Sequence, residues 1–154
     1  MDPGKSAREH YERGRTLRHT KMYEQALSEF QQATKDPNYA GEAQAQLGFC
    51  LRALGRHEEA VTAWRQALDS SSLSEEEYIH VLYLVGQCLE SLGRPAEAIE
   101  SYNWVRWQDP GFLDVESRIK NLCGGAQPSH LAQVVGLVQL GRAFIGKLPK
   151  CVAR

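Results

Sequence analysis

The feature that most constrains the fold is an internal repeat marked by one glycine and one alanine. The glycine stands at Gly14, Gly48 and Gly86, and the alanine at Ala26, Ala60 and Ala98. Both markers are 34 residues apart in the first interval (48 − 14 and 60 − 26) and 38 apart in the second (86 − 48 and 98 − 60). Because two independent markers shift together by four residues, we infer three copies of one unit, with an insertion between the second and third.

The spacing of the other repeated positions predicts two amphipathic helices in each unit. A leucine follows each glycine by three residues, an aromatic residue follows each alanine by four, and a small apolar residue follows it by seven. Steps of three, four and seven place side chains on one face of a helix. The aromatic residues are Phe30, Trp64 and Tyr102. We expect the glycine and the alanine to let two helices approach closely, and the aromatic residue to fill the gap between helix pairs.

Proline marks the end of the second helix in the first and third units but not in the second. Asp36-Pro37 and Asp109-Pro110 end those helices, because proline disfavours helical geometry in the residue before it. The second unit instead runs into a serine-rich link from 70 to 72, read as a connector, with phosphorylation as the alternative. Ser74 and Glu77 have the spacing of a capping box. We therefore expect the first helix of the third unit to start early and carry about one extra turn.

This pattern of large residue, Leu-Gly, alanine, aromatic residue and proline resembles the tetratricopeptide repeat family, over about residues 7–110. The resemblance implies an all-α, right-handed α-solenoid of three helix-turn-helix units, at about 7–38, 41–72 and 75–110. Three positions depart from the tryptophan that the family favours, namely His10, Gln44 and Leu82. Arg13 also replaces the apolar residue that usually precedes the glycine.

A capping helix is predicted at 111–122, which gives a repeat domain at 7–122. Phe112, Val115, Ile119 and Leu122 form an apolar stripe, and Gly124-Gly125 is expected to end the helix. The last pair of a repeat array needs such a cover with a polar outer side. Trp104 and Trp107 are expected to pack against it.

A linker at 123–128 and a C-terminal apolar helix at 129–148 complete the predicted organisation. Three interpretations of this tail stay open: a helix folded back onto the array or its groove, a helix that pairs with another chain, and a membrane-surface anchor through the basic end 147–154. The segment is too short and too polar at its centre to predict a membrane span. The residues assigned to groove docking or oligomerisation are Leu131, Val134, Val138, Phe144 and Ile145.

The resemblance also locates a candidate binding surface. In stacked helical pairs the first helices line the concave face. The residues assigned to this peptide-binding groove are Tyr11, Arg15, Arg18, Gln46, Phe49, Arg52, His80, Tyr83 and Gln87. Arginine beside aromatic residues would suit a peptide with one acidic and one apolar anchor, and ordinary surface without any preference is the alternative. The carboxylate clamp of co-chaperones in the family is not expected, because only Arg15 and Gln46 are polar candidates at its positions.

Composition and motifs favour a binding protein over an enzyme. A formal net charge of -1 and a pI near 6.5 give no case for nucleic acid. No phosphate-binding loop, zinc motif or nucleophile elbow is present, so we expect neither catalysis nor a cofactor or metal. Cys50 and Cys88 occupy equivalent apolar positions and are expected to be buried. The first residues contain no apolar run, which predicts a cytoplasmic setting.

The sequence therefore predicts a non-catalytic adaptor that binds a protein or peptide segment of unidentified origin. The alternatives are a homo-oligomerising or chaperone-like scaffold that uses the tail, and a peripheral membrane protein.

Overall fold

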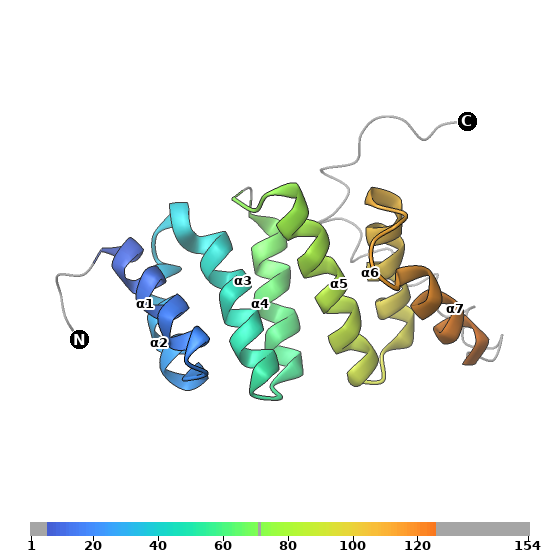
Figure 1. Cartoon of the computed structure of the whole chain (residues 1–154), viewed down its shortest axis with the longest axis horizontal. Helices are drawn as coiled ribbons and strands as arrows, with labels where there is room; N and C mark the ends of the chain where they lie inside the picture. The colour runs from blue at the N-terminus through green and yellow to red at the C-terminus, as the bar shows by residue number, and fades with distance from the viewer. Residues whose placement is uncertain (1–5, 71, 126–154) are drawn as a thin grey trace.

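The computed structural model describes residues 6–70 and 72–125, and within these residues the chain forms seven α-helices and no strand. The helices are paired in order along one axis, as Figure 1 shows. Their bounds are α1 (Ala7–His19), α2 (Tyr23–Ala33), α3 (Pro37–Ala53), α4 (His57–Asp69), α5 (Glu75–Ser91), α6 (Pro95–Gln108) and α7 (Val115–Gly125). The predicted all-α solenoid is confirmed. The predicted tail helix and its residues lie outside the described part of the chain.

Each glycine of the repeat receives the aromatic ring of its own helix pair. A Cβ atom added at Gly14 would lie 2.7 Å from the Phe30 ring. The same atom would lie 2.2 Å from the Trp64 ring at Gly48 and 2.5 Å from the Tyr102 ring at Gly86. The expectation that these rings fill the gap between pairs is therefore wrong. The ring needs a glycine opposite it because no side chain fits between the two helices at that point.

One tight turn joins the helices of each pair, and it uses a left-handed backbone conformation. Gly55 and Gly93 have φ values of 76° and 68°. In the first pair the same position is Lys21, with φ 61°. The amide that follows bonds the carbonyl five residues earlier, as Arg56 N does with Leu51 O at 2.9 Å. This is the Schellman arrangement, which normally requires glycine because a Cβ is strained there.

The four-residue insertion does not lengthen the first helix of the third unit. α3 and α5 both contain 17 residues, so the prediction of an extra turn is wrong. Instead α4 has 13 residues where α2 has 11, and the link that follows runs over 70–74 rather than 34–36. The physical reason is that no proline stops α4. The predicted capping box at the start of α5 is confirmed, since Ser74 and Glu77 each accept from the other's backbone amide.

α7 covers the end of the third pair. Val115 and Ile119 are buried, and Arg118 reaches back to α5, where its Nη1 lies 2.9 Å from Glu90 Oε1. The helix begins at Val115, later than the predicted 111, and it includes Gly124 and Gly125. Trp107 remains 49% exposed, and its ring meets the Trp104 ring edge-on at 5.9 Å.

Candidate binding pocket

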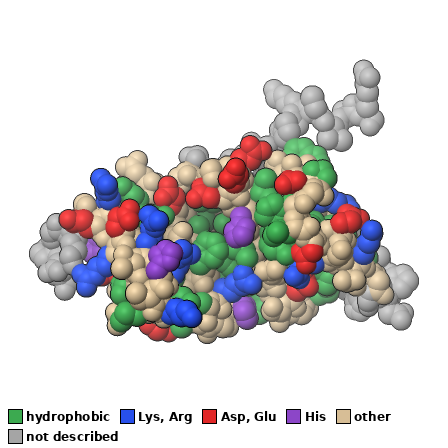
Figure 2. Space-filling model, in the orientation of Figure 1, with side chains coloured by type: hydrophobic (Ala, Val, Ile, Leu, Met, Phe, Trp, Pro, Cys, Tyr) green, Lys and Arg blue, Asp and Glu red, His purple; other side chains and the backbone are tan. Residues whose placement is uncertain are grey.

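The face formed by the first helices of the pairs contains a pocket of about 430 Å³. α3 and α5 supply most of its lining, and the α4–α5 and α6–α7 links supply the rest. It is visible in Figure 2 as a hydrophobic hollow at the centre of the face. The lining residues are Glu42, Ala45, Gln46, Phe49, Leu73, Glu76, Glu77, Ile79, His80, Val81, Asp109 and Phe112.

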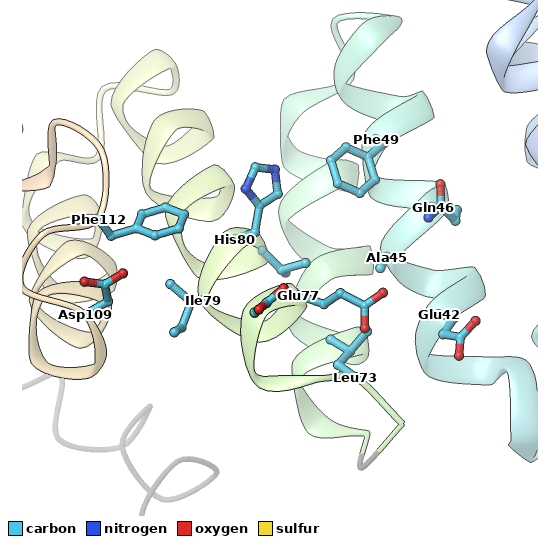
Figure 3. A pocket seen from close by; sticks show the side chains of 12 residues that line it. Glu42, Ala45, Gln46, Phe49, Leu73, Glu77, Ile79, His80, Asp109 and Phe112 are labelled. Carbon is cyan, nitrogen blue, oxygen red and sulfur yellow. The ribbon is translucent and has the colours of Figure 1, made fainter.

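Three rings form one side of this pocket. Phe112, His80 and Phe49 lie in a row in Figure 3. The His80 ring stacks on Phe49 with centroids 6.2 Å apart and meets Phe112 edge-on at 6.3 Å. Behind Phe49 the buried Trp64 ring packs at 5.7 Å, so the exposed row rests on the core. The pocket therefore offers a preformed aromatic wall, a surface that binds apolar side chains well.

Gln46 brings an amide to the edge of the pocket. Its Oε1 atom is buried, and no hydrogen-bond donor reaches it within the described residues. Almost all buried polar atoms in proteins have a partner, so this oxygen is an exception within the described residues.

Of the residues that the sequence assigns to the groove, the pocket brings together Gln46, Phe49 and His80. The other six, Tyr11, Arg15, Arg18, Arg52, Tyr83 and Gln87, do not line it. None of the three arginines does, and the charged residues that do are acidic. The expected basic anchor site is thus absent from the pocket itself.

Tyr83 differs most from its expected place, because α7 covers it. The side chain is 6% exposed, and its hydroxyl donates to Asp114 Oδ1 at 2.5 Å. The same hydroxyl accepts from Gln87 Nε2 at 3.0 Å, and Gln87 Oε1 in turn accepts from Arg52 at 3.0 Å. Burial, followed by the hydrogen bond to Asp114, raises the pKa of Tyr83. Arg118 of α7 also donates to this hydroxyl, at 3.2 Å, so the network joins α3, α5 and α7.

The residues of α1 lie outside the pocket and have partners of their own. The Tyr11 ring contacts Phe30 and Tyr39 at 5.9 and 5.7 Å. Burial, with a further contribution from Glu42, raises the pKa of Tyr11 to about 12. Arg15 pairs with Glu12 at 3.4 Å, and the Arg18 guanidinium lies 5.5 Å from the Phe49 centroid.

The sequence did not assign several pocket residues to the groove. Leu73 belongs to the α4–α5 link, while Asp109 and Phe112 belong to the link before α7. Ile79 and Val81 are largely buried in α5 and reach the pocket from its floor. Phe112 carried a signal, since it was recognised as apolar, but it was placed within the capping helix.

The described residues contain no group of three or more His, Cys, Asp or Glu side chains placed to hold a metal ion. Cys50 and Cys88 are buried as predicted. Burial raises the pKa of the Cys50 thiol to about 11 and also raises that of Cys88, which makes both poor nucleophiles. Across residues 6–70 and 72–125, none of the helices has the length and apolar character needed to cross a bilayer.

Comparisons with known proteins agree with the fold. Residues 39–106 match the family model described as tetratricopeptide repeat. The crystal structure of MamA matches with a TM-score of 0.70 at 22% identity, covering 80% of this chain and 70% of MamA. A search of curated protein sequences gave no match.

Two further structures that match contain bound peptides. The first tetratricopeptide domain of Spaghetti, bound to an HSP90 peptide, matches with a TM-score of 0.66 at 14% identity, covering 77% of this chain and 90% of that one. The Yersinia enterocolitica chaperone SycD, with a peptide of the translocator YopD, matches with a TM-score of 0.64 at 17% identity, covering 75% and 90%. At these identities the likeness is one of fold.

Proposed function

Because this chain carries tetratricopeptide repeats, and because matching structures of that fold hold peptides, we propose that it is a non-catalytic adaptor. Its ligand is a peptide or protein segment that binds in the pocket between α3 and α5. The pocket itself is the observation that carries this proposal: an open apolar cavity of about 430 Å³ on the face of the first helices.

The chemistry of the lining suits an extended segment. The row of Phe49, His80 and Phe112 offers contact area for one apolar side chain of the ligand. Gln46 also lines the pocket and adds a polar amide side chain to its edge, a group that can hydrogen-bond the backbone of a ligand. Contacts of these two kinds, an anchor in a pocket and a polar group that fixes orientation, are typical of peptide sites.

A random-peptide display selection on the full chain tests the proposal. Enriched peptides are then titrated by fluorescence anisotropy against the wild-type chain and the His80→Ala variant. We expect His80→Ala to weaken binding about tenfold, because it removes the central ring of the wall. His19→Ala is the matched control, since His19 is exposed at the end of α1 and does not line the pocket.

Equal affinity of the enriched peptides for the wild type and His80→Ala would contradict the proposal, as would a selection that enriches no peptide. Far-UV circular dichroism of each variant verifies that the helices are intact before the affinities are compared.

A further inference from the structure

The charges around the pocket are of one sign. Its four charged lining residues are carboxylates, Glu42, Glu76, Glu77 and Asp109. Figure 3 shows the labelled carboxylates Asp109, Glu77 and Glu42 on the side opposite the row of rings. In Figure 2, acidic side chains gather along the upper edge of the same hollow. A ligand on the aromatic wall therefore lies beside an acidic edge.

None of these carboxylates has a cation to neutralise it in the part of the chain that the structure describes. Glu77 caps α5 through Ser74, and Asp109 accepts from the Gly111 amide at 3.0 Å. Nine described carboxylates outside the pocket do have a basic side chain within 4 Å. Glu97, for example, accepts from Arg94 at 2.6 Å and from Arg65 at 3.0 Å. The four carboxylates at the pocket have no such basic partner within the described residues, and Glu42 interacts instead with the Tyr11 hydroxyl.

Two arginines of the first helices make contacts outside the pocket. The Arg18 guanidinium lies 5.5 Å from the Phe49 ring centroid, and Arg52 donates to Gln87. Neither lines the pocket, so the charged side chains that a ligand meets within it are all acidic. Complementary charge near a binding site acts mainly on specificity and association rate.

We propose that the segment bound in this pocket belongs to a partner protein and carries lysine or arginine next to its apolar anchor. The inference rests on the proposed function and adds the sign of charge that the pocket selects. The apolar anchor packs on Phe49 and His80, and the basic side chain lies towards Glu42 and Glu76. This is the reverse of the acidic anchor expected from the arginines in the sequence.

Two measurements on the peptides enriched by selection test whether the bound segment is positively charged. First, the enriched peptides should contain an excess of lysine and arginine over the starting library. Second, Glu76→Gln should weaken their binding about two- to fivefold, and the double variant Glu42→Gln/Glu76→Gln about tenfold, the range expected for exposed ion pairs. Raising the salt from about 50 to 500 mM should weaken wild-type binding more than binding by the double variant, which keeps two of the four carboxylates.

Glu75→Gln is the matched control. Glu75 stands beside Glu76 in the first turn of α5 and is exposed, but it does not line the pocket. Both substitutions remove one charge from the same helix end, so any general effect on α5 is shared. Only Glu76→Gln should change the affinity.

The outcomes separate this inference from the proposed function. The charge assignment would be overturned if the peptides that lose affinity with His80→Ala are neutral or acidic, or if Glu76→Gln does not change their affinity. The adaptor function would then still stand. Peptides whose affinity does not change with His80→Ala would overturn both the charge assignment and the adaptor function. A synthetic peptide of residues 129–154 is added as a probe, because this segment contains basic residues and no Asp or Glu. If it binds more tightly than every selected peptide, the assignment to a partner protein is overturned in favour of the chain's own tail.

Discussion

Replacing Gly48 with alanine places one methyl group inside the most crowded contact of the array. The added Cβ would lie 2.2 Å from Trp64 Nε1 and 2.4 Å from Trp64 Cδ1. The ring cannot move aside easily, because it is fully buried and its Nε1 donates to the Ala45 carbonyl at 3.0 Å. The substitution must therefore displace the ring and break this hydrogen bond.

The expected loss of stability follows from three contributions. Overpacking a core costs about 1–3 kcal/mol. Leaving the buried indole N–H without an acceptor costs about 1–3 kcal/mol more. In the opposite direction, alanine stabilises a helix interior by about 0.5–1 kcal/mol relative to glycine. The net effect is a loss of about 3 kcal/mol, which corresponds to a fall of about 10 °C in Tm for a chain of this size.

Urea and thermal unfolding, followed by far-UV circular dichroism, measure this loss. Gly124→Ala is the control, because nothing lies within 4 Å of a Cβ added there and the same helix preference applies. Its stability should be unchanged or slightly higher. Combining Gly48→Ala with Trp64→Phe should recover part of the loss, since the smaller ring leaves room. If Gly48→Ala unfolds at the wild-type urea concentration, the close contact between glycine and ring is refuted.

Three further predictions concern the turns, the core and the pH dependence. Lys21→Gly should raise the free energy of unfolding by about 1 kcal/mol, because it removes the strain of a left-handed non-glycine residue; an unchanged urea midpoint would argue against that strain. Ala60→Leu should lower it by about 1–3 kcal/mol, since Ala60 is fully buried, and a wild-type Tm would contradict the repeat register. Burial, then the hydrogen bond to Glu90, raises the pKa of Tyr102, so the neutral phenol contributes stability in full below pH about 10. Above that pH the Tyr102 phenol ionises in the unfolded chain before it does in the folded one, and the free energy of unfolding falls. Tyr102→Phe should make this fall shallower in urea titrations at increasing pH. An identical pH profile for the variant would exclude a contribution from Tyr102.

Local sequence patterns predicted the helix pairs well, because each repeat marker reports contacts within a single pair. The position of Ser74 before three glutamates likewise identified the start of α5. The insertion was harder to place. A missing proline shows that α4 is free to continue, but only the structure shows that two of the extra residues join α4 and two lengthen the link.

The pocket was predictable in part for the same reason. Phe49 and His80 follow from the repeat register, since both stand on first helices. Tyr83 has an equivalent register position, but its exposure depends on Asp114 just before α7 and on Arg118 within it, more than thirty residues later. Asp109 and Phe112 reach the pocket through the path of the α6–α7 link. Contacts of this range depend on how α7 packs, and no local pattern encodes that.

The aromatic positions of the three repeats have an optical consequence. The first repeat has Phe30 where the second has Trp64, so all three tryptophans of the chain, Trp64, Trp104 and Trp107, stand in the second and third repeats. Tryptophan fluorescence therefore does not report directly on the first helix pair, whereas circular dichroism records every helix. If α1 and α2 detach before the rest, the dichroism curve will begin to fall while the fluorescence stays constant. The wild-type chain thus contains its own reporter for whether the array opens from one end or melts as a unit.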